Sequence, residues 1–546
     1  MCIKRLQFVV IGILFSLCSF AGKQPVGNWN TIPLAQSIEP LKEKNFVLNG
    51  KTTIYCPDNA NELQKRNVEF LISYIEEVTG MKLKENSKLT NNQIRLSLNS
   101  SIKGNEAYEI KATPKVLMLS GSTPAGVFYG LQTLTKALPI AKNVKQVELP
   151  SVMISDSPRF VYRAFLIDVG RHFFSIEYLK KLIDMFALHH INYFHWHLTE
   201  DQGWRIEIKK YPKLTEIGSK RSGTVVGHNS DVDDSIPYGG YYTQEDAKEI
   251  VRYAQQRHIT VIPEIDLPGH TRALLAAYPE MGCTQGPYEV GHNWGIYEDV
   301  LCLGNEKIYP FLQDIIDELI PIFPAPYFHI GGDEAPTTRW QNCDRCKALA
   351  QKQGVSPKHL QGGFTNRLEK YINSKGKKII GWDEILEGDI NPSATIMSWT
   401  GVTPGVKAAK AGHDVIFSPG EYAYIDHYQT KEIHKEPKAI GGYLPVEKVY
   451  SFNPLPDTLS VEARKHIIGV QANLWTEYVP YETQAEYMLL PRVAALAEVQ
   501  WLPVNKKDYD AFHKRLTRLA RLYDRYGYTY ALHAWPERYN HQRSVW

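Results

Sequence analysis

The sequence predicts an α/β fold in which a (β/α)8 barrel follows a small α+β domain. From Arg163 onward, short apolar runs alternate with segments of helical periodicity, which is typical of repeated βα units. Eight such runs are found, the number of strands in a (β/α)8 barrel. Long connections at 198–243, 266–304 and 418–466 each follow a run. In a barrel they would all lie at the carboxyl ends of the strands, the face where this fold carries its active sites.

The small domain is predicted over residues 22–150. Helices are expected at 61–79 and 125–138, where apolar residues recur with helical spacing. Few side chains suited to acid–base chemistry occur here, so the domain is expected to support the barrel rather than to react. The boundary is expected at the proline-containing stretch 150–158. The strands of this domain are expected at 46–48, 93–98, 108–112 and 116–120.

The barrel is predicted over residues 151–546, which include a helical tail at the carboxyl end. Its first helix is expected to begin after Ser175, a residue type that caps helices. The tail beyond about residue 505 spaces Phe512, Leu516, Leu519 and Tyr523 like a buried stripe, with its basic residues on a solvated face. The strands are expected at 164–168, 191–197, 260–265, 327–331, 378–382, 395–399, 414–417 and 467–474.

Composition and charge exclude several classes of protein. The 546 residues are 43% hydrophobic and 22% charged, which excludes a disordered, collagen-like or coiled-coil chain. Basic residues exceed acidic ones by only 62 − 59 = 3. A nucleic-acid partner is therefore not expected, because binding would require a markedly basic domain or stripe.

The first 21 residues are predicted to be a secretory signal peptide. Lys4 and Arg5 give a basic start, an apolar run covers 8–20, and small residues precede the expected cut after Ala21. The run is too short to span a bilayer, and no membrane span is predicted elsewhere. We therefore expect an exported protein, periplasmic or extracellular. A lipid anchor at Cys18 is the alternative, although residues 15–17 match a lipobox poorly.

Five cysteines remain after that cut, so they cannot all pair within the chain. The candidates for pairing are Cys343 with Cys346, which are separated by two residues, and Cys283 with Cys302. A zinc site would require two further ligands at comparable spacing, and none follows Cys346. Loop disulfides or free thiols are therefore expected, with no metal and no cofactor.

Polar and aromatic side chains end the predicted strands. Each alone has a structural explanation, because a lone Asp is usually a helix cap and His270 alone would more often be structural. Gly331 and Gly332 would let a ligand approach the backbone beside Asp333 and Glu334. So many such residues on one rim are hard to explain by packing, and an active site is predicted there. The rim residues are Arg163, Asp168, Arg171, His195, His197, Asp201, Glu264, Asp266, His270, His329, Asp333, Glu334, Trp382, Asp383, Glu384, Trp399, Tyr424, Asp426, Trp475 and Glu477.

This rim suits the cleavage of a glycosidic bond. Aromatic faces cover sugar rings, and charged side chains hydrogen-bond the hydroxyls. A retaining glycosidase usually places two carboxylates about 5–5.5 Å apart on either side of the bond. Asp333 and Glu334 are contiguous and leave the backbone from nearly one point. That arrangement favours an acid plus an orienting group, so the nucleophile is expected to come from water or from the substrate.

The sequence resembles the β-N-acetylhexosaminidases of glycoside hydrolase family 20 over essentially the whole mature chain. The resemblance implies an exo-acting enzyme that releases terminal non-reducing β-linked N-acetylglucosamine or N-acetylgalactosamine from oligosaccharides or glycoconjugates, with retention and through an oxazoline. It also implies the small domain before the barrel. The matching segments are LIDVGRHF (166–173) with Arg163, HWHLTEDQGWR (195–205), PEIDLPGH (263–270), HIGGDE (329–334), GWDE (381–384) and WTE (475–477).

The resemblance also implies a role for each residue of the site. Glu334 would protonate the leaving oxygen, and Asp333 would hold the 2-acetamido group whose oxygen attacks the anomeric carbon. Glu334 would need a raised pKa, which partial burial and Asp333 favour, and Asp333 should stay ionised. Further implied roles are Tyr424 as a donor to the acetamido oxygen, Asp201 and His270 as a relay to Glu334, Trp382, Trp399 and Trp475 as a box around the sugar, and Arg163, Asp426 and Glu477 as ligands of its hydroxyls.

Two other functions remain open. A metal-dependent hydrolase would use His195, His197, His270, His329 and Asp333 as ligands, and a requirement for stoichiometric zinc would identify it. A sugar-binding protein with an inactive barrel would fail to cleave a chromogenic N-acetylglucosaminide. The sequence leaves the natural glycan, its linkage, the preferred epimer, disulfide pairing and the oligomeric state undecided.

Overall fold

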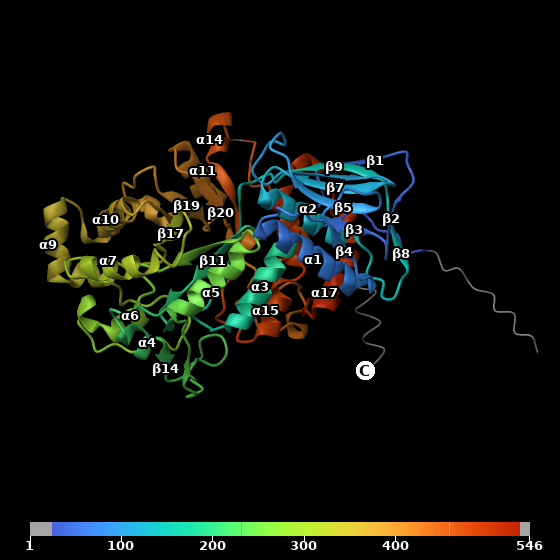
Figure 1. Ribbon diagram of the computed structural model, residues 1–546. Helices are drawn as coiled ribbons and strands as arrows, with labels where there is room; N and C mark the ends of the chain where they lie inside the picture. Colours follow the sequence, from blue (N-terminus) through green and yellow to red (C-terminus); the bar gives the residue numbers. More distant parts are fainter. Residues whose placement is uncertain (1–23, 231, 458, 536–546) are drawn as a thin grey trace, which may run out of the picture.

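The fold has the two parts that the sequence predicts (Figure 1). The computed structural model describes residues 24–230, 232–457 and 459–535. The predicted signal peptide and Cys18 lie outside these residues. No helix of the described chain is long and apolar enough to cross a membrane.

The small domain is built on a seven-stranded sheet of strand order β1-β9-β6-β7-β5-β3-β4, with β2 and β8 forming a separate pair. The helix α1 (Glu62–Thr79) begins with a capping box at Asn61 and ends at Gly80, whose φ of 79° suits glycine. The helix α2 (Pro124–Ala137) is buried along nearly its whole length. The strands are β1 (Ser37–Pro40), β2 (Phe46–Asn49), β3 (Thr53–Tyr55), β4 (Lys84–Asn86), β5 (Gln93–Leu98), β6 (Tyr108–Ala112), β7 (Val116–Gly121), β8 (Gln146–Leu149) and β9 (Val152–Asp156).

The small domain extends further than predicted. Strand β9 lies within the stretch 150–158 where the boundary is expected, beyond the predicted domain end at residue 150, and it pairs with both β1 and β6 in the sheet of the small domain. Strand β8 ends at Leu149, so Pro150 marks a turn between two strands of this domain. The change of domain therefore falls between Asp156 and Tyr162.

Eight parallel strands close into a barrel, since the first strand pairs with the last. All eight coincide with the predicted apolar runs to within a few residues. They are β10 (Tyr162–Asp168), β11 (Tyr193–His197), β16 (Thr260–Glu264), β17 (Tyr327–His329), β18 (Lys378–Trp382), β19 (Thr395–Ser398), β20 (Val415–Phe417) and β21 (Ile467–Leu474).

Helices follow most of the strands. The first, α3 (Ile176–Leu188), is capped by Ser175 as expected, because its side chain accepts from the amide of Tyr178. After β18 there is only a short 3₁₀ segment, η3 (Asp383–Glu387). Other helices of the barrel and its tail are α5 (Gln244–Gln255), α7 (Ile308–Leu319), α8 (Thr338–Asn342), α9 (Asp344–Gln353), α10 (Leu360–Ser374), α11 (Val402–Lys410), α16 (Arg492–Trp501) and α17 (Tyr509–Tyr526).

The barrel interior is filled in layers. The inward side chains of the strands form a small apolar cluster that includes Tyr162, Leu166, Ile262 and Met397. Toward the carboxyl ends, the interior becomes polar, with Glu264 at the end of β16.

The tail helix α17 connects the barrel to the small domain. In Figure 1 it lies beside α1, and Arg525 of α17 forms an ion pair with Glu77 of α1. The predicted apolar stripe is buried, Phe512 and Tyr523 completely. The expectation that Arg515 is solvated is wrong, because it is 9% exposed and its Nη2 donates to Glu498 at 2.8 Å.

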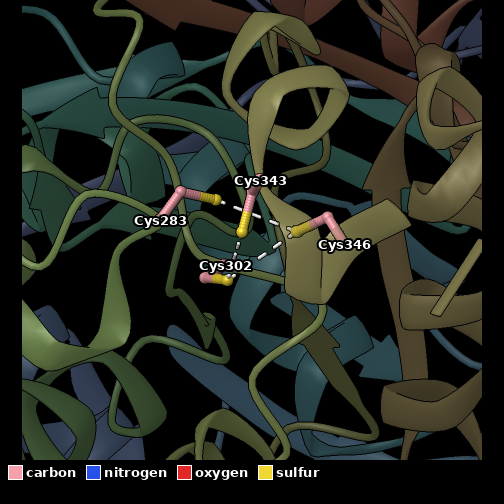
Figure 2. Close-up of side chains that lie close together, drawn as sticks. All are labelled: Cys283, Cys302, Cys343 and Cys346. Atoms are coloured by element: carbon pink, nitrogen blue, oxygen red, sulfur yellow. Dashed lines mark hydrogen bonds between the residues drawn. The ribbon is translucent and has the colours of Figure 1, made fainter. Parts of the chain in front are cut away.

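Four cysteines of the loops after β16 and β17 meet in one place (Figure 2). The sequence argument against four cysteine ligands is wrong, because the second pair precedes Cys343 instead of following Cys346. The fold brings Cys283 and Cys302 beside the later pair, and no disulfide joins any two of the four.

Candidate active site

A cavity of about 790 Å³ opens at the carboxyl ends of the barrel strands. All three long connections contribute to its wall, for example through Asn229, Trp294 and Ile440. Of the predicted site residues, the wall includes His270, Asp333, Glu334, Trp399, Tyr424, Asp426, Trp475 and Glu477. The structure therefore brings together residues that lie more than 200 positions apart.

Asp333 and Glu334 follow β17 on a left-handed stretch of backbone. Gly331 and Gly332 have φ of 68° and 106°, and Glu334 itself has φ of 48°, a rare conformation for a residue with a side chain. The prediction that the two glycines make room for a ligand is wrong, because the space beside them is filled by Asp266 and Ile385. A Cβ at Gly331 would lie 1.7 Å from the Asp266 carboxylate. They are needed so that this turn packs tightly, which fixes where the two acids point.

His270 connects the acids to a second group of carboxylates. Its Nε2 lies 3.4 Å from Glu334 and 3.7 Å from Asp333. Its Nδ1 lies 3.1 Å from Asp201 and 3.2 Å from Glu200. Although burial opposes protonation, Glu200 and Asp201 hold the pKa of His270 well above its usual value. The predicted relay therefore has the required geometry, with Asp201 behind the cavity wall and a cationic His270 in between.

The histidines that resemble metal ligands surround one carboxylate. His329 Nδ1 and His195 Nε2 lie 2.9 and 3.0 Å from Glu264, and His197 Nδ1 lies 2.5 Å from it. Burial alone would raise the pKa of Glu264, but these three rings hold it well below its usual range. A buried carboxylate with three imidazole partners accounts for the histidines as the polar layer beneath the site.

Aromatic rings form the opposite wall. The ring centroids of Trp399 and Tyr424 lie 5.9 Å apart and nearly parallel, and Trp475 lies 6.3 Å from Tyr424. Trp382 lies behind this wall, 5.8 Å from Trp475, and its Nε1 donates to Glu264 at 2.9 Å. Trp382 thus supports the wall from behind rather than lining it. Burial and nearby Asp426 hold the pKa of Tyr424 well above its usual value, so its hydroxyl is a hydrogen-bond donor.

One end of the cavity presents unpaired carboxyl oxygens. Among the described residues, neither oxygen of Asp426 has a hydrogen-bond partner, nor has Oε2 of Glu477. Burial and the charge of Glu477 raise the pKa of Asp426 well above its usual value. Buried polar atoms without partners are rare in folded proteins, and here they indicate positions where a ligand donates hydrogen bonds.

The comparisons with known proteins agree with this geometry. Residues 160–504 match the model for the glycosyl hydrolase family 20 catalytic domain, and residues 28–157 match that for domain 2 of the same family. The chain belongs to glycosyl hydrolase family 20. It is 42% identical to the β-hexosaminidase of Porphyromonas gingivalis over 96% of this chain and 68% of that protein. This family 20 enzyme is a glycoside hydrolase, a β-hexosaminidase acting on glycans that end in N-acetylhexosamine.

Solved structures show the same architecture. The GH20 β-N-acetylhexosaminidase from Streptomyces coelicolor superposes with a TM-score of 0.80 at 30% identity, covering 92% of this chain and 97% of that one. The GH20 exo-β-N-acetylglucosaminidase from Vibrio harveyi, solved with N-acetylglucosamine, gives 0.81 at 30% identity, covering 94% and 79%. The predicted barrel with a preceding domain is therefore confirmed.

Arg163 does not reach the active site of this family 20 enzyme. It lies at the amino end of β10, fully buried, where its Nη1 lies 2.6 Å from Glu106 of the small domain. It also lies over the rings of Tyr129 and Trp501. The proposed contact with a sugar hydroxyl does not fit this position, because the active face is at the other end of the strand.

Arg171 occupies the place that was assigned to Arg163. It follows the carboxyl end of β10 and lines the cavity, with Nη2 at 2.6 Å from Glu200 and 4.0 Å from Glu477. Arg171 lies three residues after the carboxyl end of β10, and this position in the sequence distinguishes it from Arg163 as a candidate for the active face. Glu200 and Trp294 also line the cavity but were not singled out for a role, since they lie in long connections without a strand register.

Glu384 is a predicted rim residue to which the family resemblance assigns no role. Trp399 Nε1 donates to its Oε2 at 2.9 Å. Burial, together with the charges of Asp333 and Asp383, raises the pKa of Glu384 to about 9. Glu384 is therefore a neutral carboxylic acid at physiological pH, held between the aromatic wall and Asp333.

Proposed function

We propose that this enzyme removes single terminal β-linked N-acetylglucosamine or N-acetylgalactosamine residues from the non-reducing ends of glycans, with retention and with the substrate's own 2-acetamido oxygen as the nucleophile. The carrying observation is the contiguous pair Asp333–Glu334, whose side chains reach one cavity from a single turn. Asp333 Oδ1 has no partner within the described residues and is available to the acetamido nitrogen.

The carboxyl groups of Glu384, Asp426 and Glu200 are poorly suited to act as a protein nucleophile. Glu384 is neutral because its pKa is about 9, and burial together with Glu477 keeps the pKa of Asp426 well above its usual value. Glu200 is ionised, but its Oε1 is occupied by Arg171 at 2.6 Å. A neutral acid or a carboxylate held by a guanidinium is a poor nucleophile, whereas a bound amide oxygen near the anomeric carbon has the advantage of proximity.

In this mechanism, Glu334 donates a proton to the leaving oxygen while the acetamido oxygen attacks the anomeric carbon. The glycosidic bond breaks and an oxazolinium ion forms, whose positive charge Asp333 stabilises. Glu334 then takes a proton from water, which opens the ring and restores the starting configuration. Tyr424 would donate to the acetamido oxygen, and Trp399 and Trp475 would enclose the acetamido group.

Two substrates that differ only at C2 test the nucleophile. The nitrophenyl β-glycoside of N-acetylglucosamine should be hydrolysed, and the matching glucoside with a 2-hydroxyl should be nearly inert. Proton NMR of the first product should show the β anomer. Comparable rates on both substrates, an inverted first product or a trapped ester between sugar and enzyme would each contradict the proposal. Repeating the measurement with the N-acetylgalactosamine glycoside gives the ratio of kcat/KM for the two epimers.

The role of Glu334 is tested by the leaving group. Glu334→Gln removes the acid, and a positioned acid typically contributes about 10²–10⁴-fold. The loss should be largest for chitobiose, whose leaving group is a sugar, and smallest for a nitrophenyl glycoside. An equal loss for both would remove Glu334 from that role.

We further propose that the chain is exported, on the basis of its basic and apolar first 21 residues. The amino-terminal sequence of the protein recovered from the periplasm or medium should begin near residue 22.

A further inference from the structure

The loops after β16 and β17 carry a cluster of four cysteine sulfurs, which we call the thiol cluster: Cys283, Cys302, Cys343 and Cys346 (Figure 2). Cys302 Sγ lies 3.7 Å from both Cys343 and Cys346, and Cys283 Sγ lies 3.8 Å from Cys346. All four sulfurs lie within 4.8 Å of one another. Cys302 and Cys346 are fully buried.

These distances correspond to a tetrahedron around a metal ion. A zinc–thiolate bond is about 2.3 Å long, so two sulfurs on a tetrahedral zinc lie about 3.8 Å apart. Disulfide pairing would instead bring the sulfurs together in twos, at about 2.05 Å. In the thiol cluster, Cys302 is equally close to two partners, so no separate pairs can be recognised.

A β-bridge positions one pair of the cysteines, and the start of a helix positions the other pair. An antiparallel bridge between Gly282 and Leu301 brings Cys283 and Cys302 together at the base of their loop. Cys343 immediately precedes α9 and Cys346 lies in its first turn, so the C-x-x-C pair is placed where the helix amino end favours thiolates. Gly304 packs against α9, and its amide donates to Cys346 Sγ at 3.4 Å.

Charge and close packing support the same assignment. A Cβ at Gly304 would lie 2.3 Å from the backbone of Arg345, so glycine permits the approach that the amide contact requires. Zinc with four thiolates carries a net charge of −2, and Arg345 lies within the same turn. Its Nη2 donates to the carbonyl oxygens of Gly282 and Cys283 at 3.1 and 3.5 Å. Such contacts around the ligands are typical of metal sites.

We propose that the thiol cluster binds one structural zinc ion. Binding releases the four thiol protons and leaves no open coordination position, so the ion is not catalytic. The ion links the loop that carries His270 to the segment that follows Glu334. A second link runs in parallel, since Asp299 pairs with Arg272 on the first loop and with Arg339 on α8. The zinc would thus hold the relay histidine and the acid in register from the outside of the rim.

Metal analysis of the purified chain tests the assignment directly. The protein is prepared without chelator or added thiol, and elemental mass spectrometry should find one zinc per chain. The cluster thiols should be unreactive in the native protein and should react with a thiol reagent after denaturation in chelator. Replacement of zinc by Co²⁺ should give the visible spectrum of a tetrahedral tetrathiolate. Stoichiometric iron, or no metal together with a mass lowered by the hydrogens of two disulfides, would overturn the proposal.

Substitution of the cysteines tests whether the zinc ion is bound at the thiol cluster. The double variant Cys343→Ser with Cys346→Ser should lose the zinc and unfold at a lower temperature. The control is Cys56→Ser, a buried thiol in the small domain outside the cluster, which should keep one zinc per chain. Should the double variant fail to fold, the single variant Cys283→Ser at the half-buried edge serves instead and should lower the zinc content or weaken its retention against chelator. Full zinc retention in all folded cluster variants would contradict the assignment.

Discussion

Asp426 is a buried carboxyl group whose position in the site is unfavourable for folding but suited to binding a ligand. It is 2% exposed, and both its carboxyl oxygens face the cavity wall without a partner among the described residues. Because burial raises its pKa, the folded state binds this proton more tightly than the unfolded state does. The contribution of Asp426 to stability therefore falls as pH rises above the unfolded value of about 3.9.

Asp426→Asn should consequently stabilise the fold while weakening substrate binding. We expect the free energy of unfolding to rise near pH 7, with little change near pH 3, where the carboxyl is protonated in the folded state and largely protonated in the unfolded state. KM should rise about tenfold, a loss of about 1.4 kcal/mol. Urea unfolding at the two pH values and steady-state kinetics measure these effects. The exposed Asp58→Asn is the control, and a destabilised Asp426→Asn would contradict the argument.

The pKa of Asp333 predicts the acidic limb of the pH profile. Burial and the charges of Glu264 and Glu334 raise it to about 6, although His270 acts in the opposite direction. Asp333 must be ionised to stabilise the oxazolinium ion, so kcat/KM should fall as pH drops through about 6. A profile that stays flat until the usual Asp range near 3.9 would show that Asp333 is not the controlling group.

At the scale of the element, the turn after β17 determines where the acids point. Gly331 has φ of 68°, and a Cβ there would lie 1.7 Å from Asp266 Oδ1 and 2.8 Å from its Cα. Gly376 has a similar φ of 77°, but nothing lies within 4 Å of a Cβ built on it. The two positions share the backbone penalty and differ only in the space around them.

Gly331→Ala should therefore cost far more than Gly376→Ala. The left-handed backbone alone costs about 1 kcal/mol, and overpacking typically adds about 1–3 kcal/mol. We expect Gly331→Ala to lower the free energy of unfolding by about 3 kcal/mol and to reduce kcat by more than about tenfold, because the acids shift. Gly376→Ala should leave kcat unchanged. Equal effects of the two variants would show that Asp266 does not restrict this turn.

Elements were easier to predict from the sequence than side-chain partners. The eight barrel strands follow from apolar runs alone, because a buried parallel strand needs them. Strand ends that meet on one rim predict that Asp201, His270 and Glu334 lie near one another, whereas their role as a relay is implied only by the family resemblance. Arg163 was misassigned because its motif neighbours lie at the other end of β10. The convergence of Cys283 with Cys346 depends on how two loops fold against each other, which no local spacing encodes.

At the scale of the whole molecule, the small domain and the barrel share an ion pair whose arginine is fully buried and whose glutamate is half-buried. Arg163 at the base of β10 pairs with Glu106 at 2.6 Å, and Glu106 Oε1 also accepts from Asn192 at 3.0 Å. The helix α2 is held between the sheet and the barrel, where Lys136 Nζ donates to the carbonyl of Leu188 at 2.7 Å. The small domain is thus bonded to the base of the barrel, opposite the cavity.

Glu106→Gln should lower the stability of the fold without changing the activity of the enzyme. Removing one partner of a buried pair leaves an uncompensated charge on Arg163, which costs about 3–5 kcal/mol. We expect a lower unfolding temperature with kcat and KM unchanged at a temperature where the variant is folded. Glu109→Gln on the partly exposed face of β6 serves as the control. A selective rise in KM would return Arg163 to the sugar-binding role.

The loop between Cys283 and Cys302 is joined at its base by the bridge between Gly282 and Leu301, and Trp294 and Ile296 at its tip line the cavity. Such a closed stretch can be exchanged as a unit, since its ends keep their positions whatever sequence connects them. We expect the tip to influence which glycans enter the cavity, while Asp333 and Glu334 lie outside the exchanged stretch. Grafting a tip from another member of this enzyme group offers a route to new glycan preferences without rebuilding the catalytic centre.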